Sequence, residues 1–325
     1  MSPHLGLLIR RNPRIAAVLA LLLGGTLAET AGAAEMMMYP TATSSFSWPT
    51  ATAWAPISGL NDPNDGVSAP ENDFVGDSAN ACAYYAMDSN YIYLRMRVQF
   101  SGTVDSSTFR DFHTFYIDRK GYGNENGLPD YGISWDSKSN DTSNHGLEFQ
   151  IAPTSKPTTW GDLKMDDKDN STGSKLIPDI NGTATGGSGI ASGWVSHTVG
   201  ADGYIRTVDG QSTTNFGTTT YIDFAVSWNY LASQYTAYPG GATTNTSALG
   251  LNQQWYFALG TNHATTDHGY PSADIAGGAN ASTAFPSQGG SGWSSVVSTA
   301  IVPEPTALIL LASAGVLFLP RRRSS

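Results

Sequence analysis

Residues 91–100 read YIYLRMRVQF and carry the clearest secondary-structure signal of the chain. Apolar side chains stand at every second position, from Ile92 to Phe100, and tyrosine, arginine and glutamine stand between them. An alternation with a period of two is typical of a β-strand that turns one face to a core and the other to the surface. We therefore expect a strand here, within an antiparallel sheet that has one buried face.

Segments with strand character recur on both sides of this stretch. Further strands are expected at residues 82–87, 112–117, 131–135, 147–151, 193–199, 204–208, 221–228, 255–259 and 293–298. Turn-forming sequences such as Asp88-Ser89-Asn90 separate them. No convincing amphipathic helix and no repeat of fixed period occurs between residues 34 and 300, which argues against α/β folds, solenoids and propellers. The sequence predicts an all-β fold, an antiparallel, jelly-roll-like β-sandwich with Trp194 and Trp228 in its core.

The amino terminus has the pattern of a secretory signal peptide. Arg10, Arg11 and Arg14 form a basic region, an apolar run follows at residues 15–27, and Ala31-Gly32-Ala33 offers small residues for cleavage. We expect residues 1–33 to direct export through the Sec machinery. An uncleaved signal anchor is the alternative, and it too leaves the folded part outside the cytoplasm.

The carboxyl terminus joins three elements in a fixed order. The motif Val302-Pro303-Glu304-Pro305 precedes an apolar run at residues 306–319, and Arg321, Arg322 and Arg323 follow. A helix of this length spans roughly 21 Å, which is short of a hydrocarbon core of about 30 Å, so the run predicts a marginal transmembrane helix. The arginines favour a cytoplasmic carboxyl terminus. Pro303 and Pro305 keep the motif extended.

This tail resembles the PEP-CTERM sorting signal of Gram-negative bacteria. The resemblance implies that an exosortase holds the chain transiently in the inner membrane, cuts it near the motif and releases it to the cell surface or the exopolysaccharide matrix. An ordinary tail anchor with a chance Pro-Glu-Pro is the alternative. The expected organisation is a signal peptide at 1–33, an extended lead-in at 34–70, a β-sandwich domain at 71–300 and the sorting signal at 301–325.

Charge excludes one class of partner. The whole chain has 17 basic and 27 acidic residues, and residues 34–300 keep 11 basic and 25 acidic residues, a net charge of −14. So acidic a domain repels nucleic acid and anionic lipid. The single cysteine, Cys82, allows no internal disulfide; a small buried apolar side chain is its expected role, and a reactive thiol is the alternative.

A second resemblance covers roughly residues 70 to 265. Its segments are YYAMDSNYIYLRMRV, FHTFYIDRKGYGNENGLPDYGISWD, GLEFQIA, TTYIDFAVSWNYL and WYFALGTN, which begin at residues 84, 112, 146, 219 and 255. Their order is similar to that of the DOMON-like β-sandwiches, which are akin to family 9 carbohydrate-binding modules. The resemblance implies a sandwich fold and a ligand such as a sugar or haem, although some relatives have no identified ligand.

The loop at residues 118–136 is the first candidate site. It gathers oxygen-bearing side chains around glycines, and Ca²⁺ prefers six to eight oxygen ligands. The candidate ligands are Asp118, Asn124, Asn126 and Asp130, with Glu125 and Asp136 nearby. The spacing does not match an EF-hand, and solvated turn residues are the alternative. A second acidic run, at residues 162–169, is expected to be a solvated loop.

Carbohydrate binding is the second candidate. A pyranose ring stacks on an aromatic face while charged and amide groups bind its hydroxyls. We expect such a group to form from Tyr131 and Trp135 with Arg95 and Arg97 on a neighbouring strand. Core packing is the alternative for the two aromatic residues.

Catalytic patterns are weak by comparison. Glu148 lacks the partner carboxylates of a retaining glycosidase, His263 and His268 lack the spacing of a zinc site, and no nucleophile elbow occurs. Met87, Met96 and the histidines could supply an axial pair for haem, but Met96 lies on the apolar face of its strand. We expect a non-enzymatic surface or matrix protein that binds carbohydrate. A secreted glycan-active hydrolase and a structural matrix protein without a ligand are the alternatives.

Overall fold

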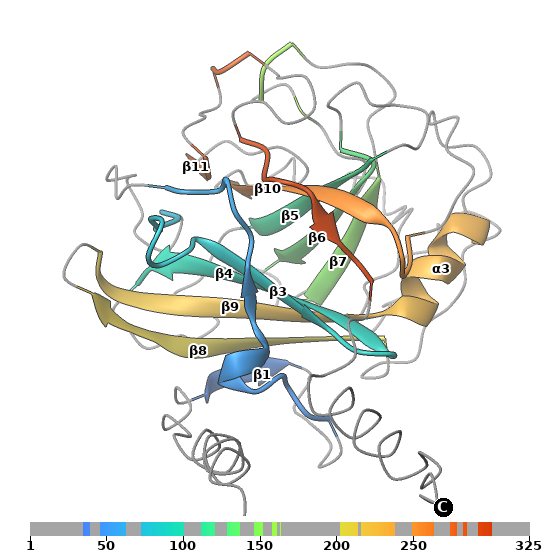
Figure 1. Cartoon of the computed structure of the whole chain (residues 1–325), viewed down its shortest axis with the longest axis horizontal. Coiled ribbons are helices and arrows are strands. Elements are labelled where there is room, and N and C mark those ends of the chain that lie inside the picture. The colour runs from blue at the N-terminus through green and yellow to red at the C-terminus, as the bar shows by residue number, and fades with distance from the viewer. Residues whose placement is uncertain are drawn as a thin grey trace, which may run out of the picture.

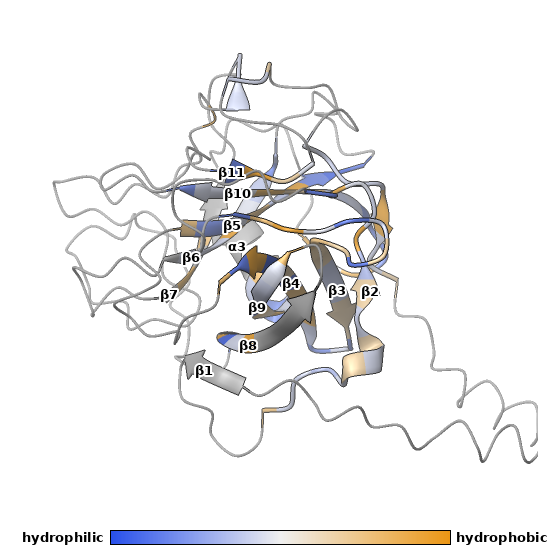
Figure 2. Ribbon diagram, turned by 90° about the vertical axis from the view of Figure 1, so that its left-hand side faces the viewer, coloured by the Kyte–Doolittle hydropathy of each residue, from blue (hydrophilic) through white to orange (hydrophobic). Residues whose placement is uncertain are grey.

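The chain folds into two antiparallel β-sheets packed face to face (Figure 1). The computed structural model describes residues 35–39, 46–62, 73–100, 112–120, 129–136, 146–151, 158–160, 163, 202–213, 216–237, 249–262, 274–277, 282–284 and 292–300. Seen from the side, β10 and β5 lie in one layer and β9, β4 and β3 lie in the other (Figure 2).

Sheet 1 has the strand order β1-β8-β9-β4-β3-β2. Its strands are β1 (Glu35–Tyr39), β8 (Gly203–Thr213), β9 (Gly217–Ser227), β4 (Tyr91–Gln99), β3 (Ala83–Met87) and β2 (Ala55–Pro56). Strands β1 and β2 come from the expected lead-in, so part of that segment belongs to the sandwich.

Sheet 2 has the strand order β11-β10-β5-β6-β7, and β12 also pairs with β10. Its strands are β11 (Asp274–Ile275), β10 (Gln254–Asn262), β5 (Phe112–Arg119), β6 (Tyr131–Asp136), β7 (Gly146–Ile151) and β12 (Val297–Ser298). The described helices are a 3-10 turn η1 (Ala51–Ala53) and α3 (Trp228–Ala237).

The core lies between the sheets and follows the alternation of the sequence. Leu94 and Met96 of β4 are completely buried there, and the ring of Phe115 from sheet 2 meets the ring of Phe224 from sheet 1 edge to face, 5.7 Å between centroids. Each buried side chain of this size stabilises the fold by roughly 1.5–3 kcal/mol relative to exposure. The expected β-sandwich and the strand predicted from residue 91 onward are confirmed.

Two sequence predictions need correction. Helix α3 was not expected; it begins where β9 ends, and Ser227 caps it by accepting a hydrogen bond from Tyr230 N to its Oγ at 3.0 Å. Of the strand expected at residues 293–298, only Val297 and Ser298 form a strand. Trp228 is in the core, as predicted, and its Nε1 donates to Asp88 O at 2.9 Å.

Several expectations lie outside the described residues. They are the signal peptide at 1–33, the sorting tail at 301–325, the strand at 193–199 and Trp194. Within the ranges that the structure describes, no helix is long and apolar enough to cross a membrane.

Candidate functional site

The outer face of sheet 1 gathers aromatic and arginine side chains. Because Ile92, Leu94, Met96 and Val98 turn to the core, the intervening residues of β4 turn outward. We call this surface the aromatic–arginine face; it consists of Tyr84 on β3, Tyr91, Tyr93, Arg95 and Arg97 on β4, Tyr204 and Arg206 on β8, and Tyr221 and Asp223 on β9, with Phe46, Trp48 and Trp54 packed over it.

One buried carboxylate holds the middle of the face. Asp223 stands opposite Arg95 on one side and Arg206 on the other, in register across β4, β9 and β8. Arg95 donates to both of its oxygens, from Nε to Oδ1 at 2.6 Å and from Nη2 to Oδ2 at 2.8 Å. Arg206 Nε donates to Oδ2 at 2.8 Å. The Asp223 side chain is fully buried, so the two arginines provide the charge compensation that a buried anion requires.

Two tryptophans lie over these arginines. The guanidinium carbon of Arg95 is 4.2 Å from the ring centroid of Trp54, and that of Arg206 is 4.5 Å from the ring of Trp48. Phe46 stacks on Tyr204, with centroids 3.8 Å apart. Residues 46–54 therefore form a strap across the face, attached through cation–π and aromatic contacts.

Arg97 has a different environment from its neighbours. Its side chain is 3% exposed, and its Nη2 donates to the hydroxyls of Tyr84, at 3.3 Å, and of Tyr221. Its Nε and Nη1 have no acceptor, and the described residues provide it with no ion pair. Arg97 is thus a buried cation without a carboxylate of its own.

Tyr84 and Tyr93 of the face are neutral at ordinary pH. Burial, followed by the nearby Tyr221, raises the pKa of Tyr84 to about 12. Burial and the hydrogen bond from its hydroxyl to Asp88 raise the pKa of Tyr93 further. Their hydroxyls can donate and accept, but they do not neutralise Arg97.

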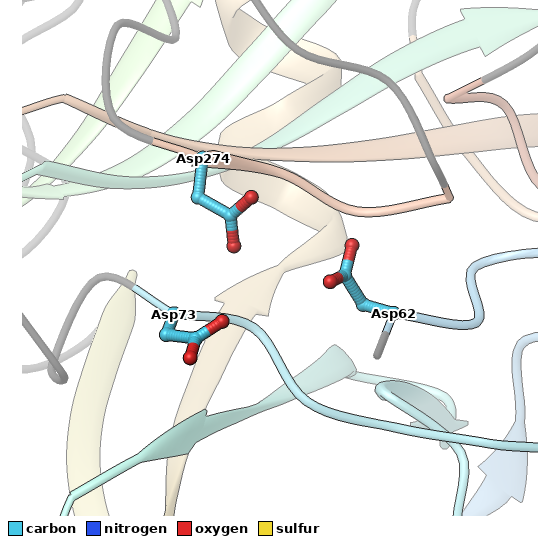
Figure 3. A group of neighbouring side chains, drawn as sticks. All are labelled: Asp62, Asp73 and Asp274. Atoms are coloured by element: carbon cyan, nitrogen blue, oxygen red, sulfur yellow. The ribbon is translucent and has the colours of Figure 1, made fainter. Parts of the chain in front are cut away.

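A second candidate site lies at the end of the sandwich, where three aspartates meet. Asp62, Asp73 and Asp274 come from three separate segments, and their carboxylates point toward one another (Figure 3). One oxygen from each lies within 4.8 Å of the others, and the residues are 2%, 0% and 6% exposed.

Hydrogen bonds of the backbone position the three aspartates. Residues 62 and 76 exchange N–H and carbonyl bonds at 2.9 and 2.7 Å, and Asp73 O accepts from Gln99 N at 2.9 Å. Asp274 Oδ2 accepts from Phe74 N at 2.8 Å, so β11 of sheet 2 is joined to the segment beside β4 of sheet 1. The trio lies where the two sheets are linked.

The trio offers the chemistry of a site for a hard cation. Three carboxylates this close repel one another in a medium of low dielectric constant unless a cation or protons neutralise them. Asp62, Asp73 and Asp274 could each give one oxygen to Ca²⁺ or Mg²⁺. Six-fold coordination would need further oxygens from water or the backbone.

Cys82 lies near the trio and is buried, as expected. Burial raises the pKa of its thiol well above the ordinary value, and the carboxylates of Asp62 and Asp274 raise it further, whereas the Arg97 guanidinium lowers it. The thiol therefore stays protonated at neutral pH, which makes it a poor nucleophile.

The structure does not bring the four expected sugar-binding residues together. Arg95 and Arg97 lie on the outer face of sheet 1, whereas Tyr131 and Trp135 belong to the core between the sheets, at 8% and 4% exposed. The aromatic partners of Arg95 are instead Trp54 and Tyr221.

The expected calcium ligands are only partly described. Asn124 and Asn126 lie outside the described residues. Asp118 is buried on β5, and Asp130 accepts hydrogen bonds from Nε and N of Arg119 at 3.0 and 3.2 Å. Asp130 therefore serves as the partner of a completely buried arginine.

Sequence reasoning missed the trio and half of the aromatic–arginine face. Asp62, Asp73 and Asp274 share no local motif, and Trp48 and Trp54 lie in a segment expected to be a lead-in. Asp223 alternates with apolar residues in β9, which places it on the outer face beside the arginines of β4. None of the protein-family models, curated proteins or solved structures compared with the chain matches it.

Proposed function

We propose that the chain is an exported, non-enzymatic protein of the cell surface or the exopolysaccharide matrix, and that it binds carbohydrate on the aromatic–arginine face. One observation carries the binding proposal: three arginines and eight aromatic residues gather on one outer face of an acidic protein. Aromatic rings stack on the apolar faces of sugars, and guanidinium groups donate to their oxygens.

The resemblances of the sequence support both parts of the proposal. The PEP-CTERM-like tail supports export, processing by an exosortase and delivery to the surface. The likeness to DOMON-like and family 9 carbohydrate-binding domains supports a binding role for the sandwich. Intact-mass measurement of the protein recovered from its producing cells tests the sorting step, because a carboxyl terminus still at Ser325 would contradict cleavage near residues 302–305.

Affinity electrophoresis of the full-length chain tests binding. Native gels that contain a dissolved polysaccharide retard a protein that binds it, and the shift gives the affinity. We expect Trp54→Ala to weaken retention at least tenfold, because it removes an aromatic ring of the face on which a sugar can stack; this ring lies over Arg95. Tyr256→Ala is the matched control, since Tyr256 is a partly buried aromatic residue on sheet 2.

The same samples separate the rival functions. Release of reducing sugar without retention in the gel would favour a glycan-active hydrolase. Neither release nor retention across a panel of polysaccharides would favour a structural protein without a ligand.

A further inference from the structure

We infer that the ligand of the aromatic–arginine face is an acidic polysaccharide, with uronate carboxylates that pair with Arg97 and sugar rings that take places beneath the strap of residues 46–54. This inference rests on the proposed function and specifies its substrate class. Three features of the face support it: its charge, its unmatched hydrogen-bond donors and the way in which the strap is attached.

The face is locally basic, although the domain as a whole is acidic and repels polyanions, so an acidic ligand would be held by the local arginines and not by the net charge. The face holds three arginines, whereas residues 34–300 have a net charge of −14. Among the described residues, Asp223 is shared by Arg95 and Arg206, and Asp88 accepts from the Tyr93 hydroxyl at the turn before β4. No described residue forms an ion pair with Arg97, and its hydroxyl partner Tyr84 is neutral at ordinary pH.

The face also has more donors than acceptors. Arg97 Nε and Nη1, Trp48 Nε1 and Trp54 Nε1 are buried and find no hydrogen-bond acceptor within the part of the chain that the structure describes. A buried donor without an acceptor is unfavourable, so a ligand whose oxygens accept from these donors gains binding free energy with each new hydrogen bond. A uronate carboxylate accepts only and matches the fork of a guanidinium, whereas a neutral sugar hydroxyl brings a donor of its own.

Arg95 provides an internal comparison for Arg97. Both lie on β4 and stack on the ring of Tyr221, at 4.5 and 5.0 Å. Arg95 donates to both oxygens of the Asp223 carboxylate, whereas Arg97 donates to two tyrosine hydroxyls. A ligand carboxylate at Arg97 would repeat the arrangement that Asp223 already makes with Arg95.

The strap is attached in a way that permits exchange. Residues 46–54 contact the face through side chains, and the backbone hydrogen bond described within this segment is local, from Ala53 N to Thr50 O at 3.0 Å. A sugar ring can therefore replace an arginine beneath Trp48 or Trp54 without breaking a strand pairing.

Affinity electrophoresis with two polysaccharides tests the inference on the full-length chain. We expect retention by polygalacturonate, at least tenfold weaker retention by neutral dextran, and a loss of the polygalacturonate shift as sodium chloride is raised. Dextran sulfate is a third arm, and stronger binding to it than to polygalacturonate would replace the uronate assignment with a sulfate one.

Matched variants locate the site. Arg97→Met should reduce polygalacturonate binding at least tenfold, and Lys120→Met, which removes one exposed positive charge beside β5, should leave it within twofold. Equal losses in the two variants would overturn the inference by pointing to net charge alone. Arg97→Lys keeps the charge without the fork and should fall between Arg97→Met and the unaltered chain, which keeps the test decisive should Arg97→Met fail to fold.

The outcomes separate binding of an acidic polysaccharide from binding of carbohydrate in general. Equal retention by dextran and polygalacturonate overturns the acidic ligand and leaves carbohydrate binding standing. No retention by any of the three polysaccharides, with folding verified by circular dichroism, counts against both.

Discussion

The two sheets differ in how their outer faces are covered, although both faces are aromatic. On sheet 2, Tyr116, Trp160 and Trp293 form a small apolar cluster, and Trp160 is completely buried. On sheet 1 the aromatic residues alternate with arginines and are only partly buried in several places. The two outer faces therefore share their aromatic content and differ in the arginines among the rings, and the proposal of a binding face rests on this difference.

A glycine allows the backbone to pack closely over the outer face of sheet 2. Gly292 has a φ of +88°, and a Cβ at this position would lie 2.7 Å from Cζ2 of Trp160. Only a residue without a side chain lets the backbone lie on the indole. Sheet 1 has no such backbone seal in the described strap, which rests on its face through side chains.

The largest effect should come from the buried tryptophan of sheet 2. Trp160→Ala removes a fully buried indole, so we expect a loss of about 3–5 kcal/mol in the free energy of unfolding. Trp54→Ala should cost less than half as much, because Trp54 is only half-buried. Urea unfolding followed by circular dichroism measures both, and equal losses would contradict the contrast between the faces.

The second-largest loss of stability should follow from removing the buried carboxylate of Asp223 in sheet 1. Asp223→Asn leaves Arg95 and Arg206 without their shared carboxylate, and we expect a loss of about 3 kcal/mol. Arg206→Met should cost about 1 kcal/mol, because Asp223 keeps both bonds from Arg95. The same urea titration reports both values, and a larger loss for Arg206→Met would mean that Arg206 is the main partner of the carboxylate.

A milder effect is expected at the aspartate trio. Asp274→Asn keeps an oxygen that can accept from Phe74 N and removes one of three crowded charges, so in EDTA we expect a change of less than about 1 kcal/mol. Repeating the melts in millimolar calcium separates two ways of neutralising the trio. A calcium-dependent rise in Tm of the unaltered chain that Asp274→Asn abolishes would indicate a cation, and melts insensitive to calcium would indicate protons.

The smallest effect concerns alkaline pH. The folded chain raises the pKa of Tyr84 to about 12, above an ordinary value of about 10, so its contribution to stability is complete below pH 10 and is lost as the pH rises toward 12. Tm should therefore fall across this window, and Tyr84→Phe should flatten part of the fall. An unchanged slope in that variant would assign the alkaline sensitivity to other groups.

The strands were largely predictable because side-chain alternation is a local property. Residues 91–100 and 221–228 each showed one apolar face, and the structure pairs β4 and β9 edge to edge with both apolar faces turned to the core. The same pattern could have assigned Tyr131 and Trp135 to the core, because they share a strand face with Ile133, which is completely buried. Alternation indicates the direction of a side chain more reliably than residue type indicates its role.

The candidate sites were less predictable because they depend on strand order. Asp62, Asp73 and Asp274 meet only because segments beside β3 and β4 reach β11 of the other sheet. Trp48 and Trp54 reach the arginines only because the segment between β1 and β2 crosses the outside of sheet 1. No local pattern contains this information.

The pairing of β4 with β9 also determines when the molecule can fold. Arg95 and Asp223 are 128 positions apart, and Phe74 and Asp274 are 200 apart. Closing loops of that length makes folding slow, and neither contact can form until synthesis has reached the last third of the chain. The complete sandwich can therefore form only after most of the polypeptide has been made, whereas the pairings β3–β4, β5–β6 and β8–β9 join neighbouring segments of the chain.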